Sequence, residues 1–176
     1  MLIKLRSASV RIDSVAINPV KSVNSLGVIL DDELKLAKHV ATVCRSSYYQ
    51  MRQLKLIPRY LDFDAAKTLV HSFVTSRVDY CNSLLASALV YQTDQLQRVL
   101  NAAAHFLLRV PRFDLDLMVK IKDKLYWLLV LECVTFKLCT LVYKSLHGLA
   151  PWYLAELCNP VTSDSYHRNL RLAVKN

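Results

Sequence analysis

Glycine is almost absent from this sequence: 176 residues contain only two. Glycine supplies the positive-φ positions on which turn-rich β-sandwiches and barrels depend, so its scarcity disfavours those folds. Apolar residues make up 53% of the chain. A chain of this length buries roughly 70% of its unfolded surface as one core. We therefore expect a mainly α-helical protein whose helices share one core.

Paired or clustered cysteines are also lacking. The five cysteines are odd in number and widely spaced, no C-x-x-C pair occurs, and no histidine stands at zinc-finger spacing from one. A disulfide framework and a structural zinc site are therefore disfavoured, and a reducing compartment is indicated. We expect no cofactor, no metal, and an intracellular protein, nuclear or cytoplasmic, that is not secreted.

No uninterrupted hydrophobic run long enough to cross a membrane is found. Three cations among the first eleven residues break any signal-peptide core. The run from Leu125 to Tyr143 is nearly long enough to span a bilayer, but Glu132 and Lys137 interrupt it. Each charge costs about 2.5 kcal/mol or more on insertion. The run is therefore interpreted as a buried helix, with no membrane partner.

Acidic residues are scarce at the front of the chain. The formal net charge is +9. Residues 1–60 hold ten Lys and Arg against four Asp and Glu, a net of +6, whereas residues 61–176 hold thirteen against ten, a net of +3. A basic excess of this kind favours a polyanionic partner.

The sequence begins with a β pattern. Val10–Ile12 and Val15–Ile17 are apolar runs on either side of Asp13 and Ser14, which is typical of a hairpin. Leu26–Leu30 is a third short apolar run that suits a buried strand. We expect a small β element at residues 1–34.

A helical period follows from residue 35 to Pro58. At 100° per residue its apolar side chains share one face: Leu36, Val40, Val43, Ser47, Met51 and Leu54. Lys35 is expected on the same helix, beside Lys38. Further helices are expected from an N-cap at Asp64, over Gln92 to Val110, near Leu115 to Ile121, from about Leu125 to a left-handed cap at Gly148, and after Pro151. The predicted fold is a bundle of five or six helices at 35–160, followed by a polar, frayed tail at 161–176.

The helix after residue 35 also carries a cationic ridge opposite its apolar face. Its basic members recur every seven residues, and two aromatic residues flank them: Lys38, Arg45, Arg52 and Arg59, with Tyr48 and Tyr49. A row of cations with adjacent aromatics suits contact with nucleic-acid phosphates. The alternative is an ordinary solvated helix face, which the spacing alone favours.

Asp31 and Asp32 follow an apolar run and superficially resemble a polymerase metal box. Two-metal phosphoryl transfer needs at least one more carboxylate from a separate strand. The only acid before Asp31 is Asp13. The ligand count therefore fails, and we expect no catalytic residues and no enzyme activity.

Several segments resemble the region after the palm in reverse transcriptases of LINE-type (non-LTR) retrotransposons, in the jockey and chicken-repeat branch. They are Ser25–Val28, His39–Val40, Ser76–Leu85, Leu96–Ala104 and Tyr143–Leu154. The resemblance implies the end of a palm at 1–34 and a polymerase-thumb-like helical domain at 35–160. It further implies an RNA-directed DNA polymerase fragment without its catalytic carboxylates.

The resemblance also implies a binding role for the cationic ridge. In such a thumb, the helix lies along the primer–template duplex, so the resemblance favours duplex binding over a solvated face. The alternatives are a helical protein–protein interaction module that self-associates through exposed apolar surface, and a remnant with no specific ligand. Leu129 stands where the family commonly has proline, so the apolar helix is expected to start earlier.

Overall fold

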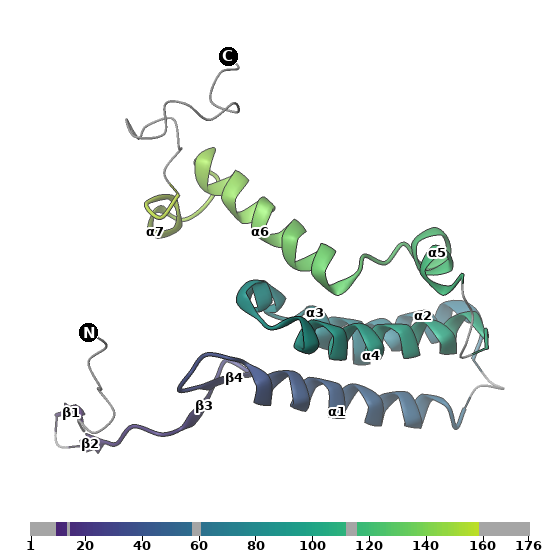
Figure 1. The fold of residues 1–176 in the computed structure, drawn as a ribbon, viewed down its shortest axis with the longest axis horizontal. Helices are drawn as coiled ribbons and strands as arrows, with labels where there is room; N and C mark the ends of the chain where they lie inside the picture. Colours follow the sequence, from purple (N-terminus) through teal and green to yellow (C-terminus); the bar gives the residue numbers. More distant parts are fainter. Residues whose placement is uncertain (1–9, 14, 58–60, 112–115, 159–176) are drawn as a thin grey trace, which may run out of the picture. The chain divides into compact units, whose positions relative to one another are not determined.

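The structure, a computed structural model, describes residues 10–13, 15–57, 61–111 and 116–158. It is mainly helical with a small N-terminal β element, which confirms the predicted fold class (Figure 1). The chain divides into two compact units, residues 1–130 and residues 131–176. The predicted tail at 161–176 lies outside the described residues.

The first hairpin has the predicted bounds. Strands β1 (Val10–Ile12) and β2 (Val15–Ile17) pair antiparallel, with Val10 opposite Ile17. The short apolar runs on either side of a turn were therefore a sufficient signal for this element.

A second hairpin corrects the predicted strand at Leu26–Leu30. Strands β3 (Ser22–Ser25) and β4 (Val28–Asp31) pair antiparallel, so Leu26 and Gly27 form the turn between them. Both turn residues have positive φ, 50° and 86°, as a two-residue turn matched to strand twist requires. The prediction missed β3 because its sequence is polar, and its side chains are largely exposed.

Helix α1 (Ala37–Leu54) has the predicted inward face. Val40, Ser47, Met51 and Leu54 are buried along it. The helix starts later than expected because Leu36 is left-handed, at φ 58°.

The placement of Lys35 on this helix was therefore wrong, since Lys35 lies before the left-handed residue. Its backbone carbonyl accepts a hydrogen bond of 2.8 Å from the buried side-chain amide of Gln92. This bond joins the start of α1 to a distant part of the chain.

Helix α2 (Phe63–Val70) continues through a π-helical turn (His71–Thr75) into α3 (Ser76–Asp79). Its N-cap is Asp62 rather than the predicted Asp64: the Asp62 carboxylate accepts from the Ala65 N–H at 2.7 Å. An N-cap side chain accepts from the second or third helical N–H, which fits Asp62.

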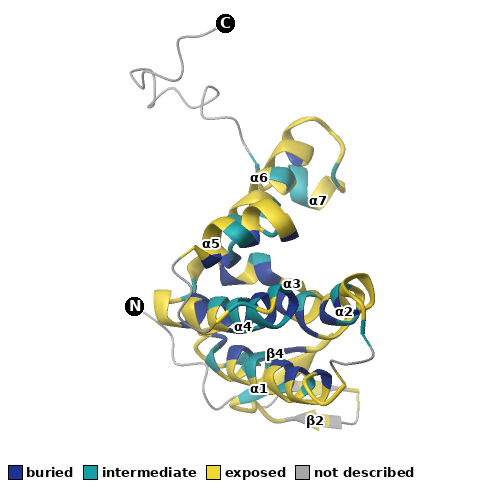
Figure 2. Cartoon of the chain, turned by 90° about the vertical axis from the view of Figure 1, so that its right-hand side faces the viewer, coloured by how far each residue is buried: buried dark blue, intermediate teal, exposed yellow. Residues whose placement is uncertain are grey.

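Helix α4 (Val90–Leu108) forms the centre of the first unit, after a 3₁₀ segment (Asn82–Ser87). Eight of its residues are buried, among them Leu96, Val99 and Ala103. It packs against α1 and α2, and the buried residues gather where α1, α3 and α4 face one another (Figure 2). The helix ends at the left-handed Arg109, two residues before Pro111.

The chain then forms α5 (Leu117–Lys120) and a π-helical turn (Ile121–Leu125). Counting the π-helical turns as parts of the helices they continue, the described residues form six α-helical segments, within the predicted range.

Helix α6 spans Val130–Leu146. The expectation that the apolar helix starts earlier was wrong, because Tyr126 is left-handed, at φ 57°, and interrupts the helix. The Val130 N–H instead donates to Gln97 Oε1 at 2.9 Å, which satisfies one of the free amides of the helix start.

The described part of the second unit contains the rest of α6 and the short α7 (Trp152–Ala155). Gly148 has φ 68°, as the predicted left-handed cap requires, and the Leu149 N–H donates to the Lys144 carbonyl at 2.9 Å. Pro151 directly precedes α7, in agreement with its predicted role.

Candidate nucleic-acid interface

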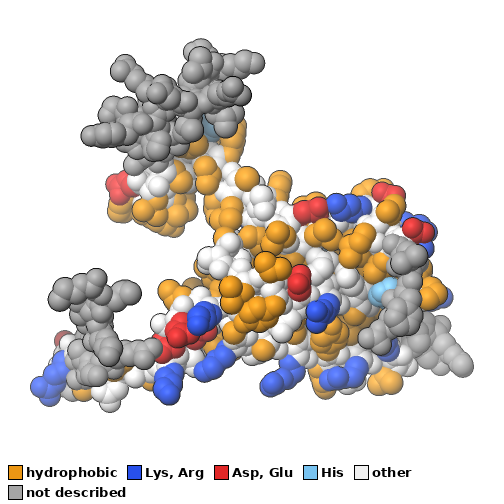
Figure 3. All heavy atoms as spheres, in the orientation of Figure 1, with side chains coloured by type: hydrophobic (Ala, Val, Ile, Leu, Met, Phe, Trp, Pro, Cys, Tyr) orange, Lys and Arg blue, Asp and Glu red, His pale blue; other side chains and the backbone are white. Residues whose placement is uncertain are grey.

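The cationic ridge is solvent-facing and straight. Lys38, Arg45 and Arg52 are all exposed on α1, on the side away from its buried stripe. Residues seven apart on a helix differ by about 20° in direction and about 10 Å in height. The three charges therefore form one row, and Lys and Arg side chains can be seen along the lower edge of the molecule, over α1 (Figure 3).

No acid on the helix compensates this row. The 18 residues of α1 include no Asp or Glu. Neither Arg45 nor Arg52 forms an ion pair with any described residue. Lys38 Nζ lies 3.4 Å from Ser22 Oγ, an uncharged partner. The row therefore keeps its full positive charge for a partner.

Two tyrosines lie between the arginines of the row. Tyr48 is 38% and Tyr49 53% exposed, and each is three or four residues from both Arg45 and Arg52, which places them on neighbouring positions of the helix surface. Exposed ring surface next to cations is what stacking with a base uses. Both predicted aromatic residues therefore adjoin the row.

Two other basic residues that were expected beside this row are not among its described members. Arg59 lies outside the described residues. Lys35, before the helix, pairs with Glu33 at 2.6 Å between exposed side chains. The hydrogen bond to Glu33 raises the pKa of Lys35, but a surface pair of this kind contributes little to stability.

Asp31, at the end of β4, has a structural role. Asp31 Oδ1 accepts a hydrogen bond of 2.7 Å from the Lys35 N–H, and the Asp31 carbonyl accepts from the Leu34 N–H at 3.0 Å. In the described part of the chain, no three His, Cys, Asp or Glu side chains are grouped so that they could hold a metal ion. These contacts shape the turn that leads into α1.

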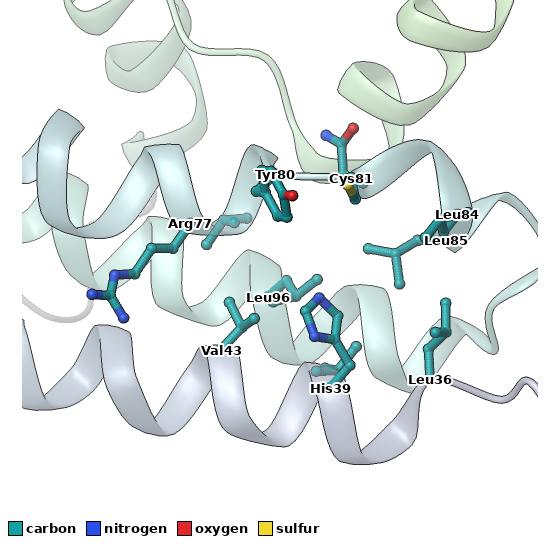
Figure 4. A pocket seen from close by; sticks show the side chains of 12 residues that line it. Leu36, His39, Val43, Arg77, Tyr80, Cys81, Leu84, Leu85 and Leu96 are labelled. Atoms are coloured by element: carbon teal, nitrogen blue, oxygen red, sulfur yellow. The ribbon is translucent and has the colours of Figure 1, made fainter. Parts of the chain in front are cut away.

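The structure also contains two hollows that the sequence prediction missed, both lined by residues of α1 and α3. The small cavity lined by Leu36, Val40 and Leu96 among others has a volume of about 10 Å³ (Figure 4). That is about the space of one water molecule, so this cavity is part of the core. Beside it, a more open cleft of about 440 Å³ lies between the β3–β4 hairpin, α1 and α3.

The sequence signals for this cleft were that Gly27, His39, Arg77 and Tyr80 belong to three of the segments on which the resemblance depends. The approach of Arg77 and Tyr80 to the hairpin depends on tertiary packing: Tyr80 Oη donates to the Leu26 carbonyl at 2.7 Å, across 54 residues of sequence. Residues this far apart are brought together only by the fold.

The cysteines and the apolar run add two findings. All five cysteines are free thiols, and burial raises the pKa of Cys44. Within the described ranges, no single helix is long and apolar enough to cross a membrane, although Leu117–Leu125 and Val130–Leu146 together meet the length and composition requirements.

Comparisons with known proteins returned no relative: no family model, no curated protein and no solved structure matched this chain.

Proposed function

We propose that the exposed face of α1 binds the sugar–phosphate backbone of a nucleic acid. The observation that carries the proposal is the row of Lys38, Arg45 and Arg52 on a helix without a single acid. Each phosphate contact by Lys or Arg releases condensed counterions, and this release supplies most of the affinity of sequence-independent binding.

The geometry of the row favours a duplex over an isolated anion. Three charges spaced about 10 Å apart along a straight helix extend over about 20 Å. A row of this length can contact several backbone phosphates of a duplex at once. Tyr48 and Tyr49 add ring surface beside the row. The site is therefore expected to bind the nucleic-acid backbone with little base specificity.

The resemblance to LINE-type reverse transcriptases supports a primer–template duplex as the partner, with α1 as a thumb helix. On this proposal, the chain is a piece of such a polymerase without the catalytic palm. It binds but does not polymerise, because two-metal chemistry requires carboxylates beyond Asp31 and Asp32. The Asp31 carboxylate is engaged in the turn between β4 and α1, where it accepts a hydrogen bond from the Lys35 N–H.

The test is the salt dependence of binding to a labelled RNA–DNA duplex. The double variant Arg45→Gln/Arg52→Gln is compared with Lys124→Gln/Lys144→Gln, which removes the same charge from exposed positions elsewhere. At about 0.9 per phosphate contact, the first variant lowers the slope of log K against log salt by about 2 units, and neutralising Lys38 and Arg59 as well lowers it by 3 to 4. The control keeps the slope. Equal slopes in both double variants would refute the proposal.

The second unit supports a different candidate, a helical module that binds a protein or itself. Several large apolar side chains in and around α6 and α7 are more than half exposed: Leu131, Phe136, Tyr143, Leu149, Trp152, Tyr153 and Leu157. Exposed apolar patches of several hundred Å² mark association sites. Burial of such a surface does not weaken with ionic strength. Sedimentation of Phe136→Gln/Trp152→Gln and of the unmodified chain, at low and high salt, separates this function from the electrostatic one.

A further inference from the structure

The cleft beside the β3–β4 hairpin is separate from the row on α1 and has its own chemistry. Its volume of about 440 Å³ falls in the range of small-molecule sites. Three elements line it, since the hairpin, α1 and α3 each contribute a wall. The residues that carry the argument are Ile29, His39, Val43, Ser46, Arg77 and Tyr80.

Arg77 gives the cleft a positive charge. Its guanidinium extends from α3 toward α1 (Figure 4), where Nη1 donates to Ser46 Oγ. A guanidinium has five N–H donors, and this bond uses one. No Asp or Glu is among the described residues that line the cleft, and Arg77 has no ion pair with the described chain. The remaining donors are therefore available to an anion.

Two further side chains that line the same cleft can donate hydrogen bonds. Ser46 accepts from Arg77, so its own hydroxyl hydrogen remains to be donated. His39 Nδ1 accepts from the Ile29 N–H at 3.5 Å, which leaves the ring hydrogen on Nε2. Burial lowers the pKa of His39, so the ring is neutral at pH 7. Arginine, hydroxyl and imidazole donors together suit the oxygens of a phosphate.

The rest of the cleft is apolar. Ile29 and Val43 line it, and the ring of Tyr80 is fixed by the hydrogen bond from its hydroxyl to the Leu26 carbonyl. At Gly27 a Cβ would lie 3.7 Å from Tyr80 Cε1, so the turn approaches the ring closely. A fixed aromatic ring next to aliphatic side chains favours a flat apolar group on the ligand.

We propose that this cleft binds an aryl phosphate monoester, with the phosphate on Arg77 and Ser46 and the aromatic group against Tyr80 and Val43. The site does not depend on the row on α1, and binding involves no covalent step. Arg77 and Ser46 set the charge and geometry of the anion subsite, and Tyr80 provides the ring contact.

The experiment is an NMR titration of the full chain with phenyl phosphate, inorganic phosphate and phenol, following the amides of Gly27, Arg77 and Tyr80. Phenyl phosphate binds about tenfold more tightly than inorganic phosphate, since it alone uses the ring contact as well as the anion subsite. Phenol binds more weakly than phenyl phosphate. Arg77→Gln weakens phenyl phosphate binding by at least about tenfold, as expected for a charged hydrogen-bonding group.

Ser76→Asp provides a second variant that keeps Arg77 and Ser46 in place. Ser76 is exposed at the cleft wall, so a carboxylate there repels the anion, and binding falls by a similar factor. Arg52→Gln, on the row, leaves phenyl phosphate binding unchanged, whereas Arg77→Gln leaves the duplex salt slope unchanged. Thermal melting confirms that each variant is folded.

Three results would overturn the proposal. They are unshifted cleft amides at saturating phenyl phosphate, equal affinity for phenyl phosphate and inorganic phosphate, and undiminished binding in folded Arg77→Gln and Ser76→Asp. The salt dependence of duplex binding in Arg45→Gln/Arg52→Gln tests the row alone. The two proposals therefore succeed or fail separately.

Discussion

The interior of the first unit and its hairpin junction are stabilised by different forces. Between α1 and α4 the contacts are mostly apolar: Val40, Leu96 and Val99 are each at most 2% exposed. The β3–β4 hairpin buries one side chain fully, Val28 at 4% exposed. It is otherwise attached by polar contacts, among them those from Tyr80 to the Leu26 carbonyl and from the Ile29 N–H to His39. Apolar burial scales with area, whereas an exposed hydrogen bond contributes little net free energy.

This difference means that the hairpin and the helical interior can unfold separately. The hairpin is able to open while the helices stay packed, because its loss removes few buried contacts. Both candidate sites lie on α1, but only the cleft has a wall made of hairpin. The row on α1 therefore depends mainly on the interior, with one hairpin contact from Lys38 to Ser22, and the cleft depends on both regions.

The largest effect is expected in the interior. Leu96→Ala leaves a cavity in the centre of α4 and lowers the free energy of unfolding by about 2 to 5 kcal/mol. Leu84→Ala, at a side chain that is 48% exposed, lowers it by about 1 kcal/mol or less. Urea denaturation followed by circular dichroism measures both. Similar losses in the two variants would show that α4 is not the core.

A smaller effect is expected at the hairpin turn. Leu26 is left-handed and 88% exposed, a conformation that costs a branched side chain about 1 to 2 kcal/mol but suits asparagine. Leu26→Asn creates an Asn-Gly turn, so the amides of Ser22–Asp31 exchange about fivefold more slowly. Amides of Leu96–Leu107 exchange more slowly than the hairpin in both proteins.

Leu34→Asn is the matched control for this experiment, since Leu34 is also left-handed, at φ 53°, and exposed, but lies outside the hairpin. It leaves hairpin exchange unchanged. Equal slowing in both variants, or a hairpin as protected as α4, would contradict the separation of the two regions.

The smallest expected effect is a pH dependence of stability that arises from His39, where α1 meets the β3–β4 hairpin. Burial lowers the pKa of His39 from its ordinary value of 6.5. Below about pH 6.5 the unfolded chain binds a proton that the folded chain resists, so the free energy of unfolding decreases as the pH falls from 6.5 toward the folded pKa. His39→Asn removes this component. Stability curves from pH 7.5 to 5 check it, and parallel curves for the two proteins would refute it.

Much of the fold was predictable because the spacing of apolar residues along a helix indicates which side chains are buried. The inward face of α1 was predicted down to Ser47, and the cap at Gly148 followed from residue type. The strand at Ser22–Ser25 was missed because an exposed polar strand leaves no apolar pattern. The start of α6 was misplaced because the hydrogen bond from Val130 to Gln97 joins residues 33 apart.

The candidate sites differ in the same way. The row of Lys38, Arg45 and Arg52 is local to one helix, so its spacing alone predicted a continuous surface. The cleft required Arg77 to meet Ser46 across 31 residues, which no local pattern encodes. Sequence therefore predicts sites built on one element better than sites built between elements.

The buried side chain of Gln92 has a consequence for which substitutions the chain tolerates. Its amide nitrogen donates to the Lys35 carbonyl, and its oxygen accepts from the Leu89 N–H at 3.3 Å. Glutamate has the same shape but, when ionised, no hydrogen to donate, and leucine has neither group. Position 92 is therefore intolerant of both, although neither would disturb helical periodicity. A mutational scan should find this polar residue more constrained than exposed leucines such as Leu26.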